Sequence, residues 1–166
     1  MKLGTTILGI DPGLQRTGWG VIKCVGNSLS YVGCGVIKSN PSDDLANRIA
    51  MLHNGLSEIM NLHKPDEAAI EETFVNKNAM SSLKLGHARG AAILSVTLAR
   101  IPISEYAALL VKKTVVGVGR AEKQQVATMI SHILPGAKGL THDAADALAV
   151  AVCHANHMGM RKLMSL

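Results

Sequence analysis

The sequence is poor in aromatic residues and in cysteine. Among its 166 residues are one Phe, one Trp and two Tyr, so aliphatic residues and Ala supply nearly all of the 48% that is apolar. The three cysteines, Cys24, Cys34 and Cys153, are odd in number and form no Cys-x-x-Cys pair. They indicate neither a disulfide framework nor a zinc site, and a reduced, cytoplasmic setting is expected.

Long apolar runs are also missing. No stretch reaches the roughly 18 uninterrupted apolar residues of a membrane span, and the run before Asp11 is too short for the core of a signal peptide. The length of the chain is typical of one domain. We expect that domain to cover residues 1–158, followed by a short C-terminal tail, 159–166, that could be disordered.

Positive charge exceeds negative charge and is concentrated in two segments. Seventeen Lys and Arg oppose twelve Asp and Glu, which gives a net charge of +5. Residues 76–90 contain three cations and no acid, and residues 112–124 contain four cations and only Glu122. The two basic segments favour nucleic acid or another anionic surface as the partner.

The spacing of apolar residues predicts an α/β fold. Strands are expected at 5–10, 18–25, 29–37, 67–71 and 102–106, and helices at 43–63, 78–99, 121–134 and 142–157. The first three strands form an antiparallel meander, because a short turn at 26–28 joins the second to the third. The fourth strand follows a crossover helix and should be parallel to the first. Ser42 is the expected N-cap of the first helix.

The second helix carries a stripe of small residues. Ser82, Gly86 and Gly90 are spaced four apart and share one face. Glycine costs about 1 kcal/mol in a helix interior, so this stripe suggests a close approach by another backbone. The stripe is a candidate dimer contact, and packing on the helix's own sheet is an equal alternative.

Two carboxylates end strands that should be parallel neighbours. Asp11 ends the first strand and Glu71 ends the fourth, so both are expected at the carboxyl edge of the sheet, where α/β proteins bind ligands. Asp11 could instead cap the turn at Pro12-Gly13. Glu71 is harder to explain structurally, because an ionised Glu at the end of an apolar strand is costly unless it is neutralised.

Two more carboxylates open the last helix. Asp143 and Asp146 lie three residues apart in an otherwise apolar stretch and point from one face. Acids also suit a helix N-terminus for dipole reasons, so this pair alone decides nothing. Four carboxylates from three elements would repel one another unless divalent cations lay between them. Such oxygen ligands suit Mg²⁺, with Mn²⁺ as a substitute, and a pair of ions about 4 Å apart can drive phosphodiester hydrolysis.

Several motifs occur together in one order along the chain. They are ILGIDPG, AIEETF, KNAMSSLKLGHARG, EYAALLVKKTVVGVGRAEKQQV and DAADALAVA, which span about Thr6 to His154. In this order and with these gaps, the chain resembles the RuvC family of bacterial Holliday-junction resolvases. The resemblance implies an RNase H-like mixed five-stranded sheet flanked by helices. It implies a homodimer that resolves four-way DNA junctions by two symmetric nicks, in recombination and repair.

The resemblance also assigns residues. The family's carboxylate set, which holds two Mg²⁺ per subunit, corresponds to the four acids chosen above. Phe74 matches an aromatic that stacks on an unpaired base at the junction centre, although it could instead close the sheet edge. Lys112 and Lys123 match basic residues near the scissile phosphate, and Lys77 lies in the same predicted DNA-binding loop as Phe74. A branch-migration complex of the RuvA and RuvB type is the implied protein partner.

Three other functions compete with this interpretation. An actin-like or sugar-kinase-like domain also begins with a strand, an Asp and a glycine turn, but such proteins need two copies of the fold and this chain is too short. A non-catalytic junction-binding protein would not need all four carboxylates. An RNase H-like nuclease acting on RNA is separated only by a substrate panel.

Overall fold

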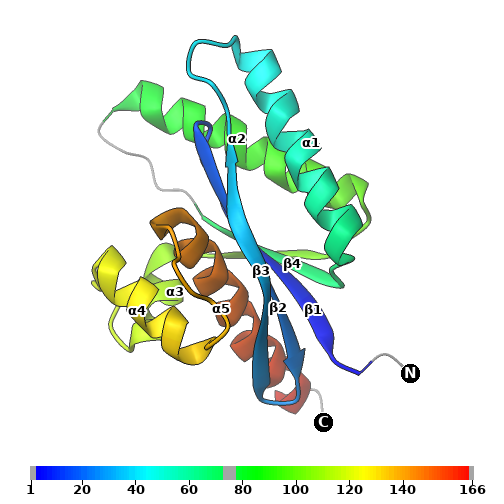
Figure 1. The fold of residues 1–166 in the computed structure, drawn as a ribbon, viewed down its shortest axis with the longest axis vertical. Coiled ribbons are helices and arrows are strands. Elements are labelled where there is room, and N and C mark those ends of the chain that lie inside the picture. Colours follow the sequence, from blue (N-terminus) through cyan, green and yellow to red (C-terminus); the bar gives the residue numbers. More distant parts are fainter. Residues whose placement is uncertain (1–2, 73–77, 165–166) are drawn as a thin grey trace.

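A mixed five-stranded sheet lies between two layers of helices (Figure 1). The computed structural model describes residues 3–72 and 78–164, with side chains described up to residue 158. The strands are β1 Thr5–Asp11, β2 Arg16–Val25, β3 Ser28–Lys38, β4 Glu67–Glu71 and β5 Ile103–Tyr106. The helices are α1 Leu45–His63, α2 Ala79–Leu98, α3 Ala108–Val116, α4 Lys123–Ile133 and α5 His142–Met164.

The strand order is β3-β2-β1-β4-β5. The pairs β1–β2 and β2–β3 are antiparallel, whereas β1–β4 and β4–β5 are parallel. The predicted meander followed by parallel strands is therefore confirmed. Because β1 is central and pairs with both parts, its carboxyl end meets the end of β4.

Two apolar cores lie on opposite faces of the sheet. Leu8 and Ile10 of β1 face α1 and α2, where they pack with Leu56 and Val96. Ile7 lies in the other core, which is built mainly from the alanine-rich length of α5 with α3 and α4. The alternation of side chains along β1 thus anchors both helical layers to the same strand.

Helix α5 packs directly on the backbone of β1 and β2. A Cβ placed on Gly9 would overlap the carbonyl oxygen of Ala147, and one on Gly18 would overlap that of Asp143. Gly20, which pairs with Gly9 in the β1–β2 register, lies under Leu148 in the same way. These strand glycines leave no room for any side chain, so the helix axis lies closer to the sheet than side-chain packing would allow.

The small-residue stripe on α2 does not pack against the sheet of its own chain. A Cβ on Gly86 or on Gly90 would meet nothing within 4 Å among the described residues. The buried face of α2 is formed instead by Ala88, Ala92 and Val96. Packing of the stripe against the sheet is therefore wrong as an explanation.

Three details of the predicted elements are corrected. Helix α3 was not predicted, because it has only nine residues and its N-cap, Ala107, makes no side-chain hydrogen bond. Asp44, not Ser42, caps α1, since its carboxylate accepts from the backbone N–H of Asn47. The last helix continues to Met164, into the stretch where a tail was expected. Within the described ranges, no helix has the length and apolarity that crossing a membrane requires.

The close contact between α5 and the sheet gives a stability prediction. Gly9→Ala should lower the free energy of unfolding by about 1–3 kcal/mol or more, because rigid backbone atoms must move to admit the methyl group. Asn54→Ala, at an exposed position of α1, is the control and should change it by no more than about 0.5 kcal/mol. Urea unfolding of both variants measures the difference. Equal effects would mean that α5 does not lie on the strand backbone.

Candidate functional site

The parallel pairing of β1 and β4 brings two acids to one edge of the sheet. Ile10 pairs with Ile70, so Asp11 and Glu71 follow as the last residues of neighbouring strands. On the other side of β1, Asp11 is paired with Gly18, whose missing side chain makes room for the start of α5. The adjacent Glu72 is exposed, as expected for the solvated neighbour of Glu71.

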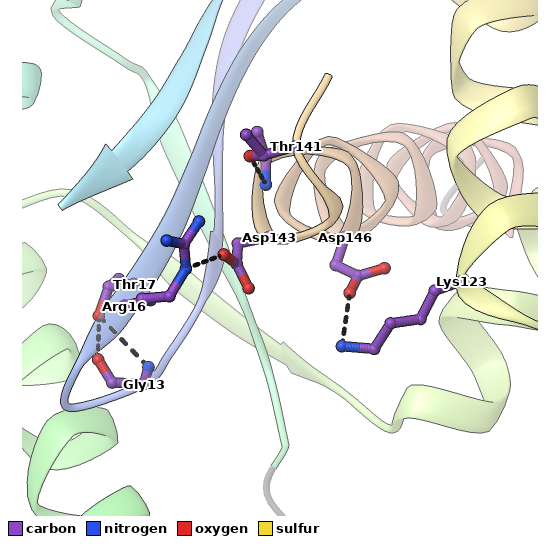
Figure 2. A network of polar contacts seen from close by, with 8 residues as sticks. Gly13, Arg16, Thr17, Lys123, Thr141, Asp143 and Asp146 are labelled. Atoms are coloured by element: carbon purple, nitrogen blue, oxygen red, sulfur yellow. Dashed lines mark hydrogen bonds and ion pairs between the residues drawn. The ribbon is translucent and has the colours of Figure 1, made fainter. Parts of the chain in front are cut away.

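The first turns of α5 bring two further acids to this edge. Asp143 and Asp146 are both half-buried, and Figure 2 shows them projecting from the same end of the helix. Thr141 precedes the helix and its hydroxyl accepts from the backbone N–H of Ala144, at 3.4 Å. The structure therefore brings together the four carboxylates that the sequence analysis selected, from β1, β4 and α5. We call Asp11, Glu71, Asp143 and Asp146 the carboxylate edge.

A cavity of about 160 Å³ opens at the carboxylate edge. Asp11, Glu71 and Asp146 line it, together with Lys112 from α3 and Lys123 from α4. The remaining wall is apolar and comes from α3, α4 and α5. Both lysines that the sequence analysis expected near a phosphate thus share this cavity with the acids.

Burial and mutual repulsion perturb these acids. Desolvation, followed by the charges of Glu71 and Asp146, raises the pKa of Asp11 to about 8. Desolvation and the charge of Asp146 raise the pKa of Glu71 to about 7, although Lys112 and Lys123 oppose the shift. The pKa of Asp146 is also raised, mainly by desolvation. The edge therefore holds more negative charge than the protein alone stabilises near neutral pH.

Two cationic side chains contact the acids of α5 (Figure 2). Arg16 Nε donates to Asp143 Oδ2 at 2.6 Å, and Lys123 Nζ lies 3.9 Å from Asp146 Oδ2. Arg16 was not selected from the sequence, although it stands at the start of β2, directly after the turn that follows Asp11. In the sequence, Arg16 is marked only as a basic residue close to Asp11. Its partner, Asp143, lies 127 residues further along the chain.

The donor set suits a hard divalent cation. Four carboxylates offer oxygen ligands only, and the raised pKa values of Asp11 and Glu71 fit a site whose charge is balanced by bound metal. Among residues 3–72 and 78–164, no three potential ligand side chains already converge on one point. Asp143 and Asp146 are instead turned toward Arg16 and Lys123. To bind a metal ion, these two carboxylates would have to leave their basic partners.

The other selected residues are placed as follows. Phe74 and Lys77 lie outside the described residues. His142, which precedes the acids of α5, is exposed at the start of that helix. Lys112 and Lys123 are the selected basic residues that the cavity brings to the acids.

The sequence matches one protein family over most of its length. The family model described as "Crossover junction endodeoxyribonuclease RuvC" matches residues 7–154. The chain belongs to the RuvC family. A RuvC protein of Azorhizobium caulinodans is 58% identical over 92% of this chain and 90% of its own, and one of Rhizobium etli is 54% identical over 95% and 93%.

Solved structures agree with the family assignment. Thermus thermophilus RuvC in complex with a Holliday junction substrate superposes with a TM-score of 0.87, at 31% identity, over 95% of this chain and 96% of that one. A yeast mitochondrial Holliday junction resolvase has a TM-score of 0.64 over 99% of this chain and 87% of that one, but its 13% identity shows the fold alone. The expected RNase H-like fold is confirmed by the RuvC match.

The raised pKa values predict how stability depends on pH in this RuvC protein. Folded Asp11 and Glu71 hold their protons to about pH 8 and 7, whereas unfolded Asp and Glu lose theirs near pH 4. The folded state therefore binds more protons in this range, and the free energy of unfolding should fall as pH rises from about 5 to 8. Thermal unfolding in EDTA should show a midpoint that falls accordingly.

Asp11→Asn separates this effect from a general one. The variant should flatten the pH dependence and unfold several degrees higher than the wild type at pH 8, because the buried charge is gone. Asp43→Asn, at an exposed position before α1, should leave the profile unchanged. If Asp11→Asn kept the full pH dependence, the carboxylate edge would not carry the unbalanced charge.

Proposed function

We propose that this chain resolves four-way DNA junctions by paired symmetric nicks, as a metal-dependent endodeoxyribonuclease of recombination and repair in the cytoplasm. The observation that carries the proposal is the carboxylate edge itself. Acids from three elements line one cavity together with two lysines in a chain of the RuvC family. The junction is the proposed substrate because the Thermus relative is described in complex with one.

The carboxylate edge is the proposed metal site. Asp11, Glu71, Asp143 and Asp146 would hold two Mg²⁺ ions, or Mn²⁺ in their place, and these supply Lewis acidity for in-line attack by water and for departure of the 3′ oxygen. Asp11 and Glu71 are the fixed part of this site, because they end paired strands of a central sheet. Asp143 and Asp146 sit on a helix and can turn from their present cationic partners toward the ions.

Lys112 and Lys123 are the proposed contacts to the scissile strand. They come from α3 and α4 and line the same cavity as the acids, where a phosphate would meet their positive charge. Lys123 has a side chain that is 67% exposed and a partner only at 3.9 Å, so it is available to DNA. Phe74, as the base-stacking residue, and Lys77, as a backbone contact, complete the proposed interface from the segment outside the described residues.

Strand mapping on a synthetic mobile four-way junction tests the function. With Mg²⁺, the protein should nick two opposing strands at symmetric positions, and it should leave linear duplex and RNA–DNA hybrid intact. Binding without nicking would favour a non-catalytic junction-binding protein. Cleavage of the hybrid in preference to the junction would assign the chain to the RNA-directed nucleases of the same fold.

Removal of any acid from the carboxylate edge should abolish nicking. Asp11→Asn, Glu71→Gln, Asp143→Asn and Asp146→Asn each delete one proposed metal ligand, and we expect a loss of at least about a hundredfold in the nicking rate, since metal ligands contribute several kcal/mol to the transition state. Junction affinity, measured by gel shift in EDTA, should be unchanged or higher, because each variant removes negative charge facing DNA. Glu72→Gln is the matched control and should nick at the wild-type rate. A fully active Asp143→Asn would remove α5 from the metal site.

Paired nicks require two active sites related by a two-fold axis, so the protein is proposed to be a homodimer. The stripe of Ser82, Gly86 and Gly90 on α2 is its proposed contact, since Gly86 and Gly90 meet nothing within their own chain among the described residues. A branch-migration complex of the RuvA and RuvB type is the proposed further partner.

Sedimentation of Gly86→Leu tests the dimer contact. A leucine on the stripe should block close approach by a second helix and raise the dimer dissociation constant at least tenfold. Asn61→Leu adds the same side chain at an exposed position of α1 and should leave the dissociation constant unchanged. A Gly86→Leu protein that remained dimeric at low concentration would exclude this face of α2.

A further inference from the structure

A second polar groove borders the loop between β1 and β2, which follows Asp11 of the carboxylate edge. It has a volume of about 360 Å³ and lies among the β1–β2 loop, Pro41, α1 and the beginning of α2. Its polar lining consists of Gln15, Arg48, Ser81 and Lys84, with no acid among the lining residues. The groove therefore carries two positive charges and no negative charge of its own.

Arg48 is a buried cation without a carboxylate partner. The residue is only 8% exposed, and its Nε donates to Ser39 Oγ at 2.9 Å. In the described part of the chain, no Asp or Glu forms an ion pair with it, and the nearby Asp44 carboxylate accepts from Asn47 instead. Burial of a guanidinium is costly unless an anion balances its charge. The unbalanced charge at the groove indicates an anionic ligand.

The chemistry of the lining selects a phosphate. A guanidinium offers several N–H donors in one plane, which match two oxygens of a phosphate, and Lys84 adds a second charge from α2. The Ser81 side chain lines the same groove. The backbone N–H of Ser81 is already bound by Asn78 Oδ1, so side chains must supply the recognition.

The groove is joined to the carboxylate edge through a short, fixed loop. Leu14 and Gln15 follow Asp11 closely in sequence and line the groove. Ser39 holds both of them, because its Oγ donates to the Leu14 carbonyl at 2.5 Å and its N–H to that of Gln15 at 3.1 Å. Since the same Ser39 Oγ accepts from Arg48, one hydroxyl fixes the loop and the arginine together.

We infer that Arg48 and Lys84 bind a backbone phosphate of the junction DNA, on the side of the carboxylate edge opposite to Lys112 and Lys123. This inference rests on the proposed function, since it assigns a further contact to the same substrate. A strand crossing the carboxylate edge would then be held on both sides of the cleaved bond, from the α1–α2 layer and from the α3–α4 layer.

Salt dependence of junction binding, measured in EDTA, tests the contact. The double variant Arg48→Met/Lys84→Ala should reduce the slope of log affinity against log salt by about 0.9, which corresponds to about a fivefold loss of affinity at about 0.15 M salt. Arg48→Met and Lys84→Ala alone should each reduce the slope by part of this amount, because both cations contact the same phosphate. Arg48→Lys should keep the wild-type slope because it keeps the charge. Lys23→Ala, at an exposed position toward the other end of β2, is the matched control and should keep it too.

Thermal unfolding distinguishes a binding role of Arg48 from a structural one. Without DNA, Arg48→Met should unfold at the wild-type midpoint or above it, because the variant removes an unbalanced buried charge. If Arg48→Met unfolded well below the wild type, Lys84→Ala would decide the question, since Lys84 is exposed and its loss leaves the core intact.

Neutral methylphosphonate linkages, placed one at a time along the cleaved strand, locate the phosphate. One neutral linkage, at a position other than the scissile one, should weaken binding by the wild type about fivefold. The same linkage should not weaken binding by the double variant Arg48→Met/Lys84→Ala any further. A wild-type slope in the double variant, or no such linkage, would overturn the inference. Competition of inorganic phosphate with DNA at the groove without any sensitive linkage would also overturn it and assign a free anion. A wild-type protein that neither binds nor nicks the junction would instead refute the proposed function.

Discussion

The contact between α5 and the backbone of β1 and β2 determines where the acids of the carboxylate edge lie. Gly9, Gly18 and Gly20 remove three side chains from the strand faces, and the helix settles onto the bare backbone. Asp143 stands directly over Gly18, which itself pairs with Asp11. A helix separated from the sheet by a normal layer of side chains would hold its acids several ångströms further from Asp11.

The carboxylate edge concentrates buried negative charge in the fold. Buried acids on β1, β4 and α5 raise one another's pKa values, and the cations Arg16, Lys112 and Lys123 offset only part of the repulsion. Such a site costs stability in the metal-free protein and gains from any divalent cation that binds it. The same logic applies at Arg48, where the unbalanced charge is positive and the missing partner is an anion. Both unbalanced sites lie beside the loop that joins β1 to β2.

Sequence reasoning succeeded where local patterns carry the information, and failed where a partner is distant. The alternation in β1, the hairpin before β3 and the apolar period of α1 predicted their elements to within a few residues. Helix α3 escaped, because it is short and has no side-chain cap. Arg16 and Arg48 were not selected for another reason. Neither belongs to a recognisable motif, and the role of each depends on residues that lie close to it only in the folded chain. The glycines of α2 suggested that another backbone packs closely on that helix. Among the described residues, close packing between a helix and the sheet occurs instead at strand glycines, which lie against α5.

The sequence by itself determined the antiparallel meander followed by parallel strands and the RuvC family. It also selected the four acids of the carboxylate edge, because strand ends, helix starts and ordered motifs are local properties of the chain. Only the tertiary structure decided how these acids are balanced. It showed Asp143 held by Arg16, Asp146 near Lys123, and no three ligands yet converging among the described residues. It also revealed that Arg48 is buried and forms no ion pair with any acid among the described residues. Charge balance is a sum over neighbours in space, and those neighbours are set by packing rather than by sequence separation.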